Sequence, residues 1–357
     1  MSYRNRALIF TKIPSGFPLS GEHLTVKDVG PFDTNQDIPA ASLLLQTLYI
    51  SFDPYLRALL RHPGIKSYFP PLSVGAALPS LSLAKVLRST LDGYSEGDVI
   101  RHSLPVQEYS VFTQAPHSDT PQNLDLSDPD TPKDLRHWLG VLGMPGLTAY
   151  SSLYEIGKPK RGETIVVTSA AGAVGQLVGQ LAKHEGLTVL GSVGSDDKLE
   201  FITKELGFDG GWNYKTEKGS TKEIIERLTN GTGIDIFYDN VGGEQLEGAL
   251  DTLNYFGRIV ACGQISQYNI DAKDRYPIYN TMQVVSKRLT MTGFIVSDDN
   301  MGLKYAASHR DKVSKCLKDG TFKAKVHETV GIENAAEAFI GMLKGENFGK
   351  AVLKIEV

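Results

Sequence analysis

Two patterns of hydrophobic positions divide this chain. Over residues 1–138, short alternating apolar segments such as ALIFTKI and LLLQTLYISF are broken by Gly, Pro, Asn and Asp, which indicates an irregular β-rich domain. From residue 139, β-branched runs alternate with segments of helical spacing, as in TIVVTSA followed by AVGQLVGQLAKHEG. Such alternation predicts an α/β architecture, a doubly wound parallel sheet with helices on both faces.

The last part of the chain returns to the first pattern. After residue 322 the spacing becomes mixed, and ENFGKAVLKI at residues 346–355 predicts a final strand of the β-rich domain. We therefore expect residues 1–138 and 323–357 to form one domain and residues 139–322 to form the other. Residues 116–134, rich in Pro, Asp and Ser, are expected to be a loop.

Composition and charge narrow the class of protein. Hydrophobic residues make up 41% and charged residues 22% of the chain, which is typical of a globular protein. The net charge of -4 and the lack of basic runs argue against general binding to nucleic acid or to an anionic membrane. The N-terminus lacks a sustained apolar stretch, so we expect a strand there rather than a secretion signal, and a cytoplasmic location by default.

A glycine-containing turn suggests a dinucleotide site. The segment TIVVTSAAGAVG, residues 164–175, predicts a strand, a tight turn and the start of a helix. In that geometry, backbone N–H groups face a pyrophosphate across the helix N-terminus. The A-x-x-G-x-x-G pattern is weak by itself, because Gly172 and Gly175 would also suit a turn that only packs the helix against the strand.

The end of the second strand bears on the choice of dinucleotide. An acid about 20 residues after the glycine turn would bind a free ribose 2′-hydroxyl, but Gly194 and Ser195 occupy that place. Asp196 and Asp197 follow and are the rival candidates, although S-D-D-K fits better as a helix cap and first turn. Lys198 would then project toward a 2′-phosphate, its alternative being a solvated surface lysine, so NADP(H) is favoured.

The two cysteines exclude a four-cysteine zinc site. Cys262 and Cys316 lie far apart without a C-x-x-C motif, which leaves a disulfide framework unsupported as well. A catalytic zinc needs about three protein ligands, and the histidines that could supply them are scattered singly along the chain. We expect no metal. Cys262 itself is interpreted as a small buried side chain, with a redox role as the alternative.

Several phrases in one order resemble a known family. The chain is similar to the zinc-independent branch of the medium-chain dehydrogenase/reductase superfamily, specifically the NADP-dependent alkenal double-bond reductases that include leukotriene B4 12-hydroxydehydrogenase/prostaglandin reductase. The phrases are SFDPYLR, GMPGLTAY, AAGAVG, GSDDK, NYKT, DNVGGE, CGQISQYN, GFIV and ENFGKAVLKI, and they span nearly the whole chain. The resemblance implies a GroES-like β-rich catalytic domain, a Rossmann NADP domain, an active site in the cleft between them, and a homodimer joined through the sixth strand of the Rossmann sheet.

The chain also departs from the family pattern. Relatives usually carry GQVIEGFGVAKV-like and GWEEY-like phrases where this chain has GAALPSLSLAKV at residues 75–86 and LPVQEY at residues 104–109. Gln264 replaces the usual small residue of CGAIS. These changes fall where substrate should be shaped, so they put the identity of the substrate in doubt.

Taken together, the motifs and the resemblance assign a set of cofactor-binding residues. Tyr214 would join Lys198 at the 2′-phosphate or merely pack, and the nicotinamide would be lined by the loops after the fourth, fifth and sixth strands. A buried strand is the plainer interpretation of residues 294–296. The full set is Met144, Thr148, Gly172, Ala173, Val174, Gly175, Gly194, Ser195, Lys198, Tyr214, Asn240, Val241, Cys262, Gly263, Gln264, Ile265, Ser266, Phe294, Ile295, Val296 and Asn347.

Without a metal, reduction of an α,β-unsaturated carbonyl is the favoured chemistry. Hydride addition at the β-carbon moves negative charge onto the carbonyl oxygen as an enolate that hydrogen-bond donors can hold. Tyr268 matches the family tyrosine and can donate a proton as a neutral phenol, its alternative being a structural role under the cofactor. Tyr55 is a further polar group over the substrate cleft, or a packing residue at the domain junction.

The sequence therefore predicts an NADPH-dependent reductase of small enals or enones. Oxidation or reduction of a secondary alcohol, a ketone or a quinone by the same site is the alternative among enzymes. A non-catalytic NADPH-binding protein is the alternative outside them.

Overall fold

The computed structural model describes residues 2–127 and 131–356, and its contacts divide the chain into two compact units. Unit 1 comprises Met1–Leu139 and Val326–Val357, and unit 2 comprises Gly140–Lys325. The predicted domain limits at residues 138/139 and 322/323 lie beside these boundaries.

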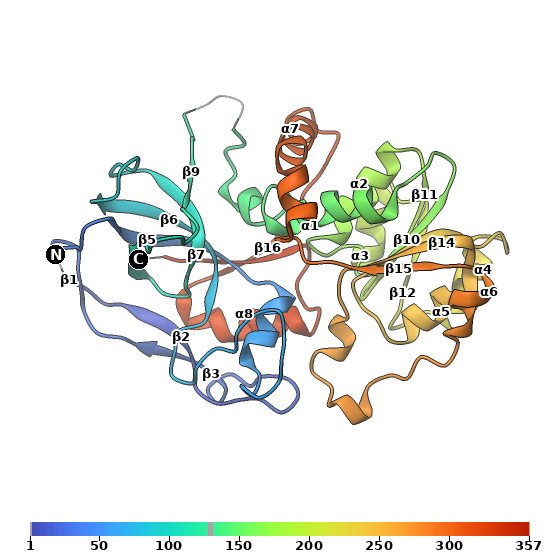
Figure 1. Cartoon of the computed structure of the whole chain (residues 1–357), viewed down its shortest axis with the longest axis horizontal. Coiled ribbons are helices and arrows are strands. Elements are labelled where there is room, and N and C mark those ends of the chain that lie inside the picture. Colours follow the sequence, from blue (N-terminus) through green and yellow to red (C-terminus); the bar gives the residue numbers. More distant parts are fainter. Residues whose placement is uncertain (1, 128–130, 357) are drawn as a thin grey trace. The chain divides into compact units, whose positions relative to one another are not determined.

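Unit 2 contains the parallel sheet predicted from the alternating pattern (Figure 1). The strands lie in the order β12-β11-β10-β13-β14-β15, and every neighbouring pair is parallel. The order reverses between β10 and β13, the switch point beside which open α/β sheets bind ligands at the carboxyl ends of their strands. The strands are β10 (Thr164–Val167), β11 (Thr188–Val193), β12 (Gly210–Asn213), β13 (Ile234–Asp239), β14 (Leu253–Ala261) and β15 (Thr290–Gly293).

Helices connect these strands, and most of the helices of unit 2 have buried residues. Ile224 and Ile225 of α4 belong to one buried cluster with Trp212 and Phe237 of the sheet, and a capping box between Ser220 and Glu223 starts that helix. The helices are α1 (Met144–Ser152), α2 (Gly175–His184), α3 (Asp196–Glu200), α4 (Thr221–Leu228), α5 (Glu244–Thr252), α6 (Met282–Ser286) and α7 (Lys304–Lys318). Shorter turns are η3 (Leu153–Gly157), η4 (Phe201–Glu205), η5 (Ile265–Gln267), η6 (Ala272–Asp274) and η7 (Asp299–Leu303).

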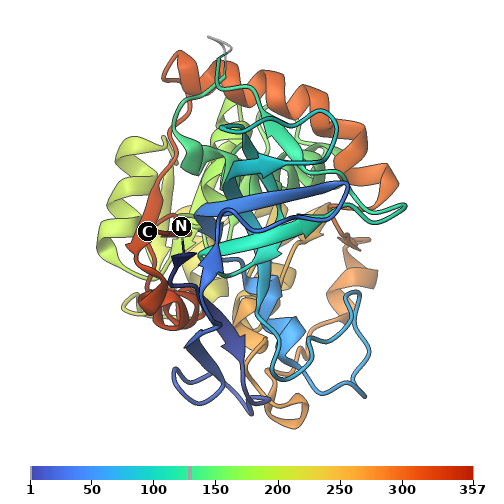
Figure 2. The same cartoon turned by 90° about the vertical axis from the view of Figure 1, so that its left-hand side faces the viewer.

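Unit 1 is β-rich and takes strands from both ends of the chain (Figure 2). Its main sheet has the order β16-β17-β5-β6-β7-β9, with β8 paired to β5, and β1-β4 and β2-β3 form smaller sheets. The strands are β1 (Ser2–Tyr3), β2 (Arg6–Phe10), β3 (Leu24–Asp28), β4 (Phe32–Asp33), β5 (Ser42–Ser51), β6 (Pro79–Ser89), β7 (Val99–Pro105), β8 (Tyr109–Thr113), β9 (Gln122–Leu124), β16 (Val326–Val330) and β17 (Lys350–Lys354).

The C-terminal strand lies within the predicted stretch of residues 346–355 but is shorter, because β17 begins at Lys350. β17 pairs antiparallel with β5, and its Leu353 joins a buried cluster with Phe52 of the β-rich unit and Phe339 of helix α8. The helical segments of unit 1 are η1 (Pro54–Leu60), η2 (Leu135–Leu139), η8 (Ile332–Asn334) and α8 (Ala335–Leu343). Strand pairing and this shared core tie the end of the chain to its beginning.

The prediction of a continuous loop over residues 116–134 was wrong in one part. β9 lies inside that stretch and pairs antiparallel with β7 at the edge of the sheet, because an edge strand offers backbone hydrogen bonds even to a polar segment. Residues 128–130 of this stretch lie outside the described residues.

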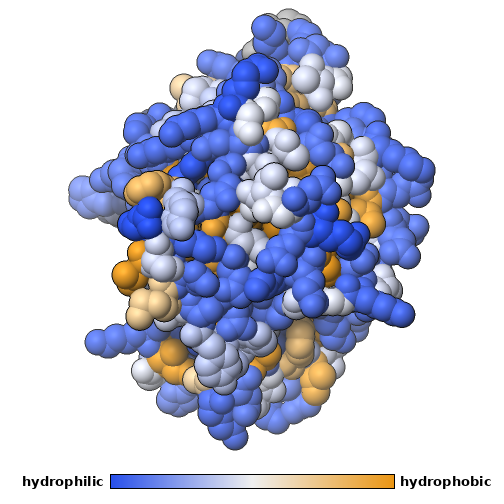
Figure 3. All heavy atoms as spheres, turned by 90° about the vertical axis from the view of Figure 1, so that its right-hand side faces the viewer, coloured by the Kyte–Doolittle hydropathy of each residue, from blue (hydrophilic) through white to orange (hydrophobic). Residues whose placement is uncertain are grey.

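Figure 3 shows one face of the protein on which hydrophilic atoms predominate and hydrophobic atoms lie in separate areas. Among the described residues, no helix combines the length and the apolar character needed to cross a bilayer.

Candidate active site

The glycine turn after β10 holds α2 close against the sheet. Ser169 adopts a φ of 51° and its carbonyl accepts a hydrogen bond from the Gly172 N–H at 2.9 Å. A Cβ on Gly175 would lie 2.4 Å from the Ser169 oxygen, so only glycine fits there. α2 begins at Gly175 with Val174 at its N-cap, whose apolar side chain offers no acceptor to the first-turn N–H groups. The turn therefore meets the packing requirement and also has the form of an anion-binding helix N-terminus.

A basic and aromatic cluster surrounds Gly194, which follows β11. A Cβ on Gly194 would lie 3.1 Å from the Tyr214 hydroxyl and 3.4 Å from Cε of Lys215. Burial lowers the pKa of Lys198, and the positive charge of Lys215 lowers it further. Two cations held near each other beside a glycine suit a doubly charged phosphate, which would offset their repulsion.

The rival acids at this position are engaged in starting a helix. Ser195 is the N-cap of α3, and its hydroxyl accepts from the Lys198 N–H at 3.4 Å. Asp196 and Asp197 occupy the first turn, and the Asp196 carboxylate accepts a hydrogen bond from Asn213 Nδ2 at 2.8 Å. The S-D-D-K phrase is thus a cap and first turn, as its composition indicated.

Asp239, at the end of β13, organises the loops predicted to line the nicotinamide. Its Oδ1 accepts hydrogen bonds from the backbone N–H groups of Val241 at 3.0 Å and Gly242 at 2.8 Å. Its backbone carbonyl accepts from the N–H groups of Cys262 at 2.9 Å and Gly263 at 3.0 Å. One residue therefore ties the loop after β13 to the loop after β14.

Asp239 is also a buried ionisable group. It is 1% exposed, and its second carboxylate oxygen has no hydrogen-bond partner among the described residues. Burial raises its pKa to about 6, although the N–H groups of Gly242 and Val241 partly oppose that shift.

Further hydrogen bonds connect the loop after β13 to the loop after β14. Asn240 donates from Nδ2 to the Thr168 carbonyl at 2.7 Å, which also connects the loop to the end of β10. The N–H of Ile265 donates to the Asn240 carbonyl, and both the N–H and the hydroxyl of Ser266 donate to the Val241 carbonyl. The predicted nicotinamide residues that follow β13 and β14 are thus brought together.

The Tyr268 hydroxyl folds back over the same loop. Its oxygen accepts a hydrogen bond from the Gln264 N–H at 3.1 Å, and a Cβ on Gly263 would lie 2.9 Å from it. Gln264, the departure from the family pattern, is exposed and lies close to Gly242, where a Cβ would be 2.9 Å from its Cγ. The Tyr268 hydroxyl therefore lies against the backbone of the loop that follows β14.

Cys262 belongs to a buried polar chain. Its thiol contacts the Tyr238 hydroxyl, which lies 2.7 Å from Ser152 Oγ, and Ser152 in turn donates to the Thr148 carbonyl at 2.7 Å. Burial raises the pKa of the thiol to about 12, so it is a protonated thiol at neutral pH and not a thiolate nucleophile. The residue as a whole is half-buried rather than fully buried.

Met144 and Thr148 contact each other within α1. Thr148 is 7% exposed and donates its hydroxyl to the Met144 carbonyl at 2.8 Å, with the Met144 sulfur 3.4 Å away. The Thr148 hydroxyl thus bonds within its own helix.

Residues 294–296 do not continue the sixth strand. β15 ends at Gly293, and Phe294, Ile295 and Val296 follow it as half-buried residues outside any strand. The interpretation of these residues as a buried strand was therefore wrong, because β14 supplies pairing partners only as far as Gly293.

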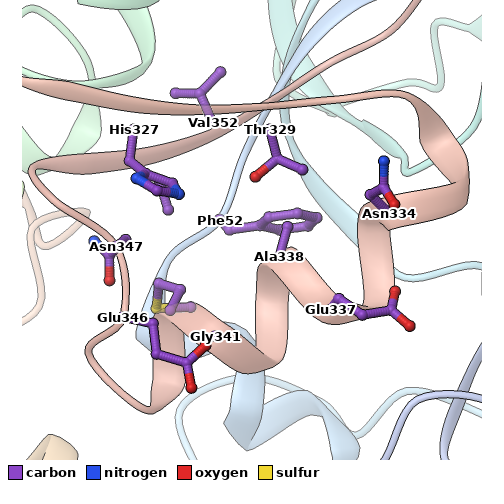
Figure 4. Close-up of a pocket in the computed structure, with 12 residues that line it drawn as sticks. Phe52, His327, Thr329, Asn334, Glu337, Ala338, Gly341, Glu346, Asn347 and Val352 are labelled. Atoms are coloured by element: carbon purple, nitrogen blue, oxygen red, sulfur yellow. The ribbon is translucent and has the colours of Figure 1, made fainter.

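Two predicted site residues lie in unit 1. Tyr55, in η1, is half-buried with its ring centroid 5.6 Å from that of Phe69, and burial followed by the charge of Asp53 raises the pKa of its phenol. Asn347 donates from Nδ2 to the Gly349 carbonyl at 2.6 Å. It lines a pocket of about 270 Å³ between the β16 and β17 strands and α8 (Figure 4).

Sequence reasoning missed two residues of unit 2. Lys215 follows Tyr214 in the NYKT phrase, and Asp239 opens the DNVGGE phrase, so both stood inside motifs already singled out. Lys215 was missed because alternation along the chain does not show which lysines converge in space. Asp239 was missed because its role depends on burial and on backbone partners from another strand.

Comparison with family models covers most of the chain. Residues 6–119 match the N-terminal domain of oxidoreductase family, and residues 173–309 match a family described as zinc-binding dehydrogenase. The name of the second family mentions zinc. Within residues 2–127 and 131–356, however, no three His, Cys, Asp or Glu residues are grouped so that they could hold a metal ion.

Individual relatives match over nearly the whole length. An NADP-dependent oxidoreductase, RED1, of Cochliobolus heterostrophus is 46% identical and covers 99% of this chain and 98% of its own. The NADP(+)-dependent 2-alkenal reductase of Nicotiana tabacum is 34% identical, with coverage of 98% and 97%. The solved structure of CurA from Vibrio vulnificus in complex with NADPH has a TM-score of 0.87 at 32% identity and covers 99% of both chains.

The chain belongs to the medium-chain dehydrogenase/reductase superfamily, with its parallel Rossmann sheet and β-rich GroES-like domain. Within that class it is an NADP-dependent oxidoreductase of the branch that contains the alkenal reductases, the prostaglandin reductases and CurA, and its cofactor is NADP(H).

Proposed function

We propose that this enzyme uses NADPH to reduce the C=C bond of α,β-unsaturated aldehydes or ketones. The observation that carries this proposal is the position of the Tyr268 hydroxyl, which accepts from the Gln264 N–H within the loop that follows β14. The name of the tobacco relative, a 2-alkenal reductase, supports the same reaction.

The cofactor fits the loops at the carboxyl edge of the unit 2 sheet. The turn at residues 172–175 would receive the pyrophosphate, and Lys198, Tyr214 and Lys215 would hold the 2′-phosphate. The loops that Asp239 ties together, with residues 294–296, would line the nicotinamide. Asn347 is proposed as a further contact of the cofactor, and Met144 and Thr148 of α1 as contacts of the nicotinamide ring.

Each step of the reaction assigns a task to a residue of this chain. When bound, NADPH supplies the hydride that adds to the β-carbon of the enone. The π electrons of the C=C bond then shift toward the carbonyl oxygen and give an enolate. The neutral phenol of Tyr268 stabilises this enolate by donating a hydrogen bond. Tyr268 delivers a proton to the α-carbon, directly or through a water molecule, and recovers it from solvent. Tyr55 orients the substrate.

Isotope labelling tests the reaction. An enone should be saturated at C=C with its carbonyl intact, with deuterium from C4-labelled NADPH at the β-carbon and deuterium from heavy water at the α-carbon. The analysis requires mass spectrometry and NMR of the isolated product. An allylic alcohol as the main product would refute the proposal in favour of carbonyl reduction.

The enzyme is also proposed to be a homodimer joined through β15. This strand lies at the edge of its sheet, where Met291 is 44% exposed and no strand of the described residues pairs with its outer side. Met282 and Val285 of α6, the helix that precedes β15, are 71% and 70% exposed and would add apolar surface to such an interface. Sedimentation equilibrium should give twice the chain mass, and Met291→Lys should shift the protein toward monomer.

A further inference from the structure

A buried ion pair joins the two segments of unit 1 that carry its predicted site residues. Lys350 Nζ lies 2.8 Å from Asp53 Oδ1, and the two side chains are only 1% and 5% exposed. Asp53 directly precedes η1, which contains Tyr55, whereas Lys350 directly follows the loop that contains Asn347. The pair therefore connects segments almost 300 residues apart in the sequence.

Each charge of the pair has additional hydrogen bonds. Lys350 Nζ also donates to the Phe52 carbonyl at 2.6 Å, and Ser51 Oγ donates to Asp53 Oδ2 at 2.5 Å. Asp53 stands at the N-cap position of η1, yet its side chain makes no cap hydrogen bond there. The carboxylate is thus directed toward β17 rather than toward its own helical turn.

The surroundings of the pair are apolar. Phe52, Leu56 and Ala351, which flank it along the chain, belong to the main hydrophobic cluster of unit 1. Burial lowers the pKa of Lys350, and the charge of Asp53 opposes that shift. Such a pair adds little net stability over well-packed apolar residues, because removing both charges from water offsets their attraction. What the pair contributes is therefore the fixed geometry of the two segments that it joins, and not stability.

The loop between α8 and β17 depends on this anchor. Gly349 adopts a φ of 87°, which glycine takes without strain, and its carbonyl receives the Asn347 side chain. Phe52 and Ala351, the chain neighbours of Asp53 and Lys350, line the same pocket as Asn347 (Figure 4). A shift of Lys350 would therefore move Asn347 and the start of η1 together.

We propose that Asp53 and Lys350 are positioning residues that hold Tyr55 and Asn347 in fixed relation to each other for substrate and cofactor. This inference rests on the proposed roles of Tyr55 and Asn347. The pair contacts neither the substrate nor the reacting atoms, and acts only through the backbone segments that it joins.

The test removes both charges and follows binding and catalysis separately from stability. In Asp53→Asn/Lys350→Met, kcat/KM for an enone should fall about tenfold or more, because small displacements of orienting groups are expensive in catalysis. The Kd for NADPH should rise, and urea unfolding should show that the variant remains folded under the assay conditions. The milder Ser51→Ala variant, which keeps both charges, should show a smaller loss of kcat/KM.

A mutant cycle separates positioning from simple damage. If the pair acts through Tyr55, then Tyr55→Phe should lower kcat/KM clearly in the unmodified protein but very little in Asp53→Asn/Lys350→Met. Fully additive losses, or unchanged kinetics in the pair variant, would overturn the proposal. The control is Arg6→Met/Glu108→Gln, which removes another ion pair of unit 1, 2.6 Å long, and should leave both readouts unchanged.

The proposed function can fail without any bearing on the ion pair, because it is tested on the unmodified protein. Unmodified protein that saturates no enone would refute C=C reduction without reference to the pair. The positioning role would then be decided by the NADPH affinity alone, which must fall in the pair variant and stay constant in the control.

Discussion

The two ends of the candidate cofactor site in unit 2 are built in opposite ways. Around Gly194 the groups are side chains near the surface, and Tyr214 is 46% exposed. After β13 and β14 the groups are mostly backbone N–H and carbonyl groups arranged about Asp239, which is 1% exposed. At the first end, we expect a single substitution to change the preference for NADPH without altering the fold. The second is part of the fold, so a substitution there affects stability and catalysis together.

The sharpest test of this contrast is the pH dependence of stability in Asp239→Asn. Asp239 has a pKa of about 6 when folded against 3.8 ordinarily, so between those pH values the folded protein holds a proton that the unfolded chain has lost. Stability should therefore decline as pH rises from about 4 to about 6, by roughly 3 kcal/mol in total, and then stay level.

Asp239→Asn should lack this decline. Urea unfolding of both proteins at several pH values measures the difference between them, which removes the contribution of other titrating groups. Parallel curves would mean that Asp239 is not the buried acid that ties the two loops together.

The next effect concerns chemistry at the end that Asp239 organises. Tyr268→Phe removes only a hydroxyl, so kcat should fall by roughly 10²-fold while the Kd for NADPH changes little. Stopped-flow kinetics and fluorescence titration measure the two quantities. Unchanged turnover would assign proton delivery to water or to the cofactor ribose and leave Tyr268 a structural role.

Substitutions around Gly194 should change the affinity for NADPH with little change in the stability of the protein. Lys198→Ala and Lys215→Ala should each weaken NADPH by on the order of tenfold to a hundredfold and leave NADH binding unchanged, because one charge-assisted contact is worth about 1.5 to 3 kcal/mol. Lys204→Ala, which removes a lysine paired with Glu200 on the surface, is the matched control. Equal affinity of the unmodified protein for NADPH and NADH would contradict the phosphate assignment.

The smallest expected effect is that of metal removal, which should be none. If a hydrogen bond from Tyr268 stabilises the enolate, prolonged chelation should leave activity unchanged, and metal analysis should find no stoichiometric zinc. One tightly held zinc per chain, with activity lost on its removal, would replace Tyr268 by a Lewis acid as the stabilising group.

Local pattern in the sequence was enough to predict the class of fold. The alternation of β-branched runs and helical spacing predicted the parallel sheet of unit 2, because side-chain periodicity follows directly from strand and helix geometry. The S-D-D-K phrase predicted the cap of α3, since capping uses neighbours in the chain. The final strand β17 was also predicted from its own residues.

Only the tertiary structure decided which distant residues meet. Asp239 gains its raised pKa and its partners Cys262 and Gly263 from burial beside another strand, and Lys350 meets Asp53 only because β17 pairs with β5. Strand β9 arose from pairing that its polar composition did not indicate. Periodicity and capping depend on a few neighbouring residues, so the sequence by itself determined the alternating strands and helices of unit 2 and the cap of α3. Burial and pairing between remote segments depend on the whole chain, so only the tertiary structure decided β9, the end of β15 and the surroundings of Asp239 and Lys350.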